Sequence, residues 1–144
     1  MSNYITRGIR NNNPLNIKIS DNRWIGKINP SKDKVFEQFD LMEHGIRAGL
    51  IVLRTYIRKY DLTSVDAIIN RFAPECENNL HNYTDYIKKH LRFYGFDSSD
   101  NIVFGSDKFK RVVQAMLMFE SRLDFPISAI QHIIDKYSLY GPGK

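Results

Sequence analysis

The chain has 144 residues and a mass of 16.9 kDa, which suffices for one globular domain but leaves no room for a separate cofactor-binding domain. Hydrophobic residues make up 42% and charged residues 26%, with only eight Gly and five Pro, so disordered, collagen-like and low-complexity classes are excluded. Uninterrupted apolar runs such as residues 50–53 are too short to span a membrane, and the polar N-terminus lacks the apolar stretch of a signal peptide. We therefore expect neither membrane insertion nor signal-dependent export.

Charge is distributed unevenly along the chain. Residues 1–60 hold 11 Lys and Arg against five Asp and Glu, whereas residues 61–144 hold 10 against 11. A basic first half suits a polyanion such as nucleic acid, anionic lipid or the bacterial cell wall, although a merely solubilising surface explains it equally well. Cys76 is the single cysteine and the four histidines are scattered, so the sequence predicts no disulfide framework, no metal site and no cofactor.

The N-terminal part has the pattern of short strands. Residues 16–28 carry apolar side chains on both sides of the turn-prone segment 20–22, which predicts a hairpin. Residues 35–39 predict a third short strand. Together these segments predict a small antiparallel β-lobe over about residues 14–39.

From residue 40 the apolar spacing changes to three and four, as in amphipathic helices. The pattern predicts about five helices, which start near residues 40, 63, 81, 107 and 126, and a polar loop at residues 75–80. Asp40 and Glu43 form a capping-box pattern at the first of these helices. The predicted fold is thus α+β, mostly α, a single domain over residues 1–144 with a helical lobe at about 40–138. A cleft between the two lobes could hold a polymer.

Glu120 is the acidic residue whose position is most unusual. It follows Val113 and Met116 at helical spacing, so its carboxyl projects from the apolar face of the helix. Desolvation and the negative end of the helix dipole both disfavour the anion, so we expect a raised pKa. A carboxylic acid that stays protonated near neutral pH is what a glycosidase uses to protonate a leaving oxygen. The alternative from periodicity alone is a surface ion pair of Glu120 with Arg111 or Arg122.

Three further residues are candidates with weaker signals. Glu43 lies in the first turn of a helix, where capping and the helix dipole lower its pKa, so a structural role is favoured. Glu77 lies in a polar segment that is free to face a cleft, and repulsion from Glu75 could raise one of their pKa values. Trp24 could stack on a sugar or simply pack in the sheet.

The whole chain resembles a family of phage-encoded lysozyme-like and virion proteins built around an RGIRNNNPGNI motif. The resemblance covers residues 7 to about 137 and is carried by RGIRNNNPLNI (7–17), WIG (24–26), EHGIRA (43–48), RFAP (71–74) and YI (86–87). The sequence departs from the family pattern at three places. Leu15 stands where the family usually has Gly, and Phe72 stands where it often has Trp. After Glu120 the chain reads Ser121-Arg122, where the family usually has Asn-Gly.

A more distant similarity links the chain to lytic transglycosylases and flagellar-type glucosaminidases. In those enzymes the catalytic Glu ends a helix in a Glu-Ser context, as Glu120-Ser121 does here, and a small lobe with Asn-Leu-Phe-Gly-Ile-Lys and Trp-x-Gly follows. In this chain the order is reversed, which suggests a circularly permuted lysozyme-like domain. The same alignment implies that Tyr86 lines the cleft.

These resemblances imply a phage enzyme that cleaves the glycan strand of peptidoglycan, with Glu120 as general acid and Glu77 as the second carboxylate. Tyr86, Trp24 and the run Asn11, Asn12 and Asn13 would position the sugars. If no second carboxylate faces the cleft, a transglycosylase is favoured over a hydrolase. We expect a monomer, located in the virion or in the host cytoplasm before release to the wall.

Two rival functions remain open at this stage. A virion structural or adaptor protein could keep the fold without activity, and could contact other virion proteins. A nucleic-acid binder could use Arg7, Arg10, Lys18, Arg23 and Lys27, but no known nucleic-acid module is recognisable, so we expect no nucleic-acid partner.

Overall fold

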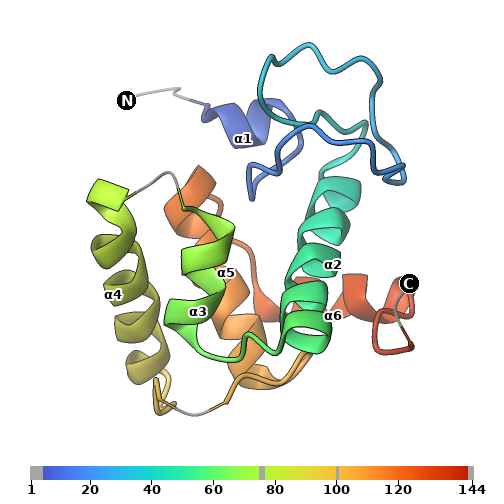
Figure 1. The fold of residues 1–144 in the computed structure, drawn as a ribbon. Coiled ribbons are helices and arrows are strands. Elements are labelled where there is room, and N and C mark those ends of the chain that lie inside the picture. Colours follow the sequence, from blue (N-terminus) through green and yellow to red (C-terminus); the bar gives the residue numbers. More distant parts are fainter. Residues whose placement is uncertain (1–4, 75–76, 100, 143–144) are drawn as a thin grey trace.

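The computed structural model describes residues 5–74, 77–99 and 101–142, while the side chains of residues 77–79 lie outside this description. The described part contains six helices and no strand: α1 Arg7–Arg10, α2 Met42–Tyr60, α3 Val65–Phe72, α4 Glu77–Phe93, α5 Asp107–Ser121 and α6 Ile127–Lys136. Figure 1 shows α2 to α5 standing side by side, with α6 crossing near their lower end. The irregular segment that links α1 to α2 lies over their upper end.

The five long helices match the predicted ones, and their apolar stripes form a single core. This core combines Leu50 and Leu53 of α2, Ile68 and Ile69 of α3, Tyr83, Ile87 and Leu91 of α4, Val113 and Met116 of α5, and Ile130 and Ile134 of α6. Three residues of the predicted apolar spacing emerge at the surface instead, since Tyr60 is 42%, Tyr86 37% and Phe119 37% exposed. Period and burial therefore agree along most of each helix, but not at every position.

Some helix starts differ from the predicted ones, although α5 begins at Asp107 as predicted. Helix α2 begins after Leu41, which makes no side-chain capping bond, and the Asp40 carboxylate contacts His44 Nδ1 at 2.6 Å instead. The predicted capping box at Asp40 and Glu43 is therefore wrong. Helix α4 already begins at Glu77, within the segment predicted to be a polar loop.

The predicted β-lobe is also wrong: the described part of residues 14–39 holds only two isolated antiparallel bridges, Lys18 with Phe36 and Lys27 with Phe39. The two arms of the predicted hairpin do not pair with each other, because each pairs with part of residues 36–39. The side chain of Asn13 takes the place of further backbone pairing. Its Nδ2 donates to the carbonyls of Ile17 and Glu37, both at 2.9 Å, and its Oδ1 accepts from Ile17 N at 3.0 Å. Backbone groups that a longer sheet would pair are thus already bonded.

The N-terminal segment packs closely on the helices through two glycines. A Cβ built on Gly45 of α2 would lie 1.8 Å from the Asn12 carbonyl oxygen, and one built on Gly8 of α1 would lie 2.0 Å from Ser121 Oγ. Ser121 is fully buried, and its hydroxyl donates to the Pro14 carbonyl at 2.6 Å. The segment is therefore fixed to both α2 and α5.

Replacing Gly45 by Ala tests this close packing. We expect Gly45→Ala to lower the free energy of unfolding by about 2–3 kcal/mol, because the obstructing atom is backbone and cannot swing away. Urea unfolding measures the change. Gly141→Ala is the control, since its Cβ would lie 3.4 Å from the Ser138 carbonyl oxygen, an ordinary contact. Equal stability of the two variants would contradict the packing described.

Candidate functional site

Glu120 lies in the last turn of α5, directly before Ser121, where the N-terminal segment meets the helix. The helix ends there because Arg122 adopts the left-handed conformation, with φ of 54°. The Asn16 Nδ2 donates a hydrogen bond of 2.9 Å to Glu120 Oε1 across 104 residues of sequence. Asn16 is itself left-handed, with φ of 53°, a conformation that Asn tolerates better than most residues. Two special backbone conformations thus bring the amide and the carboxyl together.

Aromatic side chains border the same carboxyl. The ring of Tyr83, fully buried on α4, stacks on Phe119 with centroids 4.0 Å apart, and its hydroxyl lowers the pKa of the Glu120 carboxyl. Tyr86, one turn further along α4, lies 5.7 Å from Phe119 between ring centroids. Tyr86 and Phe119 are each 37% exposed. The carboxyl is therefore flanked by a partly exposed aromatic surface of the kind on which sugar rings stack.

Burial raises the pKa of Glu120, while the hydrogen bonds from Asn16 and Tyr83 lower it to a smaller extent. The direction of the shift is the predicted one, and desolvation is its main cause. The predicted alternative, an ion pair of Glu120 with Arg111 or Arg122, is absent from the described contacts, and Arg111 lies over the Tyr94 ring at 3.5 Å and donates to Gln114 Oε1 at 3.0 Å. The Glu120 carboxyl is thus half-buried, has neutral hydrogen-bond donors as neighbours, and stays protonated at higher pH than an exposed glutamate does.

Removing one neutral donor should raise this pKa further. Tyr83→Phe keeps the stacked ring but deletes the hydroxyl that favours the Glu120 anion, so the pKa of Glu120 should rise above that of the unmodified chain. Carboxyl-carbon NMR of the folded protein measures it. Tyr86→Phe is the matched control, since this hydroxyl makes no described bond to Glu120. A fall in the pKa with Tyr83→Phe would contradict this role of the Tyr83 hydroxyl.

A small hollow adjoins the site through Asn16. It has a volume of about 240 Å³ and is lined by Asn16, Ile17, Lys18, Val52, Tyr56, Arg71, Phe72 and Pro74. The Asn16 Oδ1 is buried and has no hydrogen-bond partner among the described atoms, although Nδ2 of the same amide is bonded to Glu120. Asn16 therefore connects the carboxyl with this hollow.

Glu43, another candidate carboxylate, has different partners from Glu120. Glu43 accepts from Lys136 Nζ at 2.7 Å and from the Tyr137 hydroxyl, and these contacts lower its pKa. The lowered pKa was predicted, but the cause is an ion pair and not a helix cap. Glu77 begins α4, and its side chain lies outside the described residues. Its role as second carboxylate stays a prediction.

The side chains of the asparagine run, residues 11–13, form hydrogen bonds within the N-terminal segment. The amide Nδ2 of Asn11 donates to Asp33 Oδ2 and that of Asn12 donates to the Phe39 carbonyl, both at 3.0 Å. The amide of fully buried Asn13 holds Ile17 and Glu37, as described above. These bonds organise the segment that carries Asn16, and the sugar-binding role predicted for the three residues stays a prediction.

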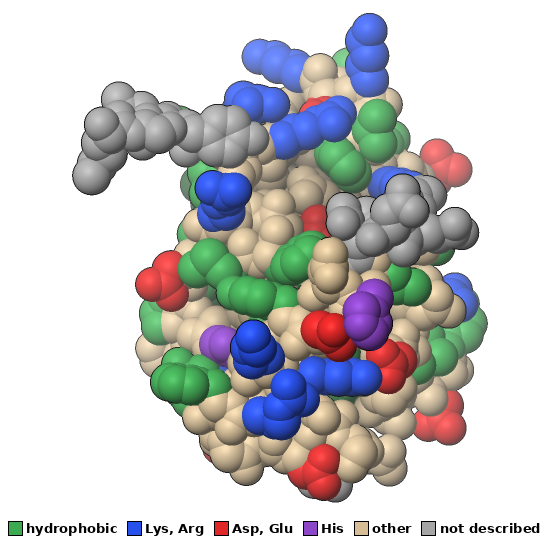
Figure 2. Space-filling model, turned by 90° about the vertical axis from the view of Figure 1, so that its left-hand side faces the viewer, with side chains coloured by type: hydrophobic (Ala, Val, Ile, Leu, Met, Phe, Trp, Pro, Cys, Tyr) green, Lys and Arg blue, Asp and Glu red, His purple; other side chains and the backbone are tan. Residues whose placement is uncertain are grey.

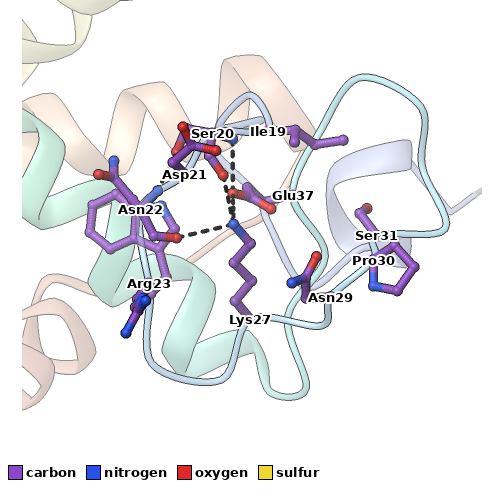
Figure 3. A pocket seen from close by; sticks show the side chains of 11 residues that line it. Ile19, Ser20, Asp21, Asn22, Arg23, Lys27, Asn29, Pro30, Ser31 and Glu37 are labelled. Carbon is purple, nitrogen blue, oxygen red and sulfur yellow. Dashed lines mark hydrogen bonds and ion pairs between the residues drawn. The ribbon is translucent and has the colours of Figure 1, made fainter.

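Trp24 lines a different hollow, of about 600 Å³, together with the loop residues 19–23, Lys27, residues 29–31 and Glu37. Figure 3 shows Lys27 between Ser20, Asn22 and Glu37, where its ammonium bonds the two carbonyls at 2.7 and 3.0 Å and Glu37 Oε2 at 3.0 Å. Asn16 and Glu120 are absent from this lining, so the structure does not bring Trp24 and Glu120 into one site.

Sequence reasoning missed three residues of the site. Asn16 contacts Glu120 only through the tertiary fold, and periodicity carries no signal for it. Phe119 was assigned to the buried face. Tyr83 was treated as an apolar core residue, yet a buried tyrosine hydroxyl usually has a hydrogen-bond partner, and that rule could have pointed to a nearby polar group.

The surface charge follows the asymmetry seen in the sequence. Figure 2 shows the α4 side of the molecule, where Lys and Arg side chains gather at the upper end and acidic, basic and histidine side chains mix lower down. Among the described residues, no group of three or more His, Cys, Asp or Glu could hold a metal ion. Within the same residues, none of the helices combines the length and apolar character needed to cross a bilayer.

Two curated viral proteins are similar to part of this chain. Protein P5 of Pseudoalteromonas phage PM2 is 48% identical over 88 residues, which is 59% of this chain and 55% of that protein. Uncharacterized protein ORF158 of Acidianus bottle-shaped virus (isolate Italy/Pozzuoli) is 28% identical over 95 residues, which is 59% of this chain and 57% of that protein. The chain thus spans little more than half the length of these relatives. No family model matches it. The similarities support the predicted viral origin.

Proposed function

We propose that this chain cleaves the glycan strand of peptidoglycan, with Glu120 as general acid and base. The observation that supports the proposal most is the half-buried Glu120 carboxyl, whose pKa is raised by burial and which is held by Asn16 and Tyr83. The adjacent aromatic surface of Tyr86 and Phe119 offers a place for a sugar ring. The family resemblance of the sequence points to the same chemistry.

In the proposed reaction the protonated Glu120 gives its proton to the glycosidic oxygen, and the bond from that oxygen to the sugar carbon breaks with positive charge developing on the sugar ring. The Glu120 anion formed in this step is stabilised by the hydrogen bonds from Asn16 Nδ2 and Tyr83. The anion then takes a proton from the attacking group, which restores the acid. The attacking group is water in a hydrolase and a hydroxyl of the same sugar in a transglycosylase.

The direct test is release of soluble fragments from purified cell walls. Glu120→Gln keeps the size and hydrogen-bonding capacity of the side chain but cannot donate the proton, so we expect fragment release to fall at least 100-fold. Asp124→Asn removes the same charge from an exposed residue four positions away and should keep full activity. Mass analysis of the fragments identifies reducing or anhydro ends and so the reaction type. Equal release by wild type and Glu120→Gln would refute the role of Glu120.

The raised pKa also predicts how stability depends on pH. Between the ordinary pKa of Glu120 and its higher value in the fold, the folded chain binds more protons than the unfolded chain, so this group makes stability fall as pH rises. Glu120→Gln should therefore stabilise the protein near pH 7 and leave it unchanged near pH 4. Thermal unfolding at both pH values measures the effect, and stabilisation at pH 4 only would contradict it.

A second candidate function is a component of the virus particle without wall-cleaving activity. The similarity to viral proteins whose names carry no activity favours it. Contacts with other virion proteins, and a place in the virion or in the host cytoplasm before release, belong to this part of the proposal. If wild type releases nothing from several wall types and the protein is found in purified particles, this second function is the correct one.

A further inference from the structure

Away from Glu120, arginine side chains converge on a hollow between α2 and the two irregular segments of the chain. The hollow has a volume of about 630 Å³ and is lined by Asn22, Arg23, Trp24, Ile25, Arg47, Ile51, Arg54, Thr55, Tyr137, Ser138, Leu139 and Pro142. Arg23 comes from the N-terminal segment, whereas Arg47 and Arg54 lie seven residues apart on α2 and therefore on one face of that helix. Asp and Glu are absent from this lining.

The two arginines of α2 are withdrawn from water without an acidic partner in the described structure. Arg54 is only 9% exposed, and its single described hydrogen bond runs from Nη1 to the Leu139 carbonyl at 2.9 Å. Arg47 is half-buried over the Tyr137 ring at 5.2 Å, and its Nε is buried without a hydrogen-bond partner. The neighbouring Glu43 carboxylate instead accepts hydrogen bonds from Lys136 and Tyr137. Buried cations are normally compensated by an anion, and the described residues of this lining supply none.

We propose that this hollow, named here the arginine hollow, binds a small soluble phosphate monoester whose remaining part has an apolar or aromatic face. Guanidinium groups bind phosphate through two parallel N–H donors, and a doubly charged phosphate suits three cations, two from α2 and one from the N-terminal segment, better than a single carboxylate does. The side chains of Ile25, Ile51 and Tyr137 would contact the remaining part of the ligand. The volume lies in the range of small-ligand sites, which favours a soluble molecule over an extended polymer.

Titration calorimetry at low salt tests the proposal with two probes, inorganic phosphate and phenyl phosphate. We expect phenyl phosphate to bind at least fivefold more tightly, because only this probe adds an apolar ring. Arg47→Gln should weaken its binding at least tenfold. Arg58→Gln is the matched control: it removes the same charge from the same helix, but Arg58 is not part of the lining and instead bonds the carbonyls of Tyr140 and Gly141. The control should bind within twofold of wild type.

Two further measurements keep the test decisive. If Arg47→Gln proves unstable in thermal unfolding, Arg23→Gln replaces it, since Arg23 is exposed, and a loss of at least threefold then supports the arginine hollow. Equal weakening by Arg47→Gln and Arg58→Gln would show nonspecific charge attraction and overturn the proposal. The protein could also sediment with vesicles that contain phosphatidylglycerol while it fails to bind phenyl phosphate. That result would assign the hollow to a lipid headgroup and overturn the proposal of a soluble ligand.

Discussion

The docking of the N-terminal segment on the end of α5 is the interaction on which the candidate site depends. Ser121 is bonded on both sides, since its hydroxyl donates to the Pro14 carbonyl and its carbonyl accepts from Thr6 Oγ1 at 2.9 Å. This buried residue fixes the segment two positions before Asn16 and directly after Glu120. A buried hydroxyl without these partners would cost about 1–3 kcal/mol, so the docked arrangement is strongly preferred.

The helical part of the fold could be predicted because its information is local. The spacing of Leu50, Leu53 and Ile57, or of Val113 and Met116, specifies which face is buried whatever that face contacts. The N-terminal segment could not be predicted in this way. Its short apolar runs fit a hairpin, but tertiary bonds of the Asn13 amide take the backbone groups that a sheet needs.

The same distinction applies to the candidate site. The position of Glu120 on an apolar helix face indicated burial and a raised pKa, because the apolar face of a helix is the face that packs against the rest of the protein. The partners of the carboxyl come from other elements: Asn16 from a turn and Tyr83 from α4. Glu37 was not singled out at all, yet its side chain is fully buried and held by Lys27. Polar residues in irregular segments acquire such roles only through tertiary contacts.

The bond between Asn16 and Glu120 also has a consequence for synthesis on the ribosome. Its two residues leave the ribosome 104 positions apart, so the amide must wait until α5 has been made before its acceptor exists. A truncated product that stops before α5 lacks the carboxyl. Any chemistry at this carboxyl is therefore withheld until α5 has been translated.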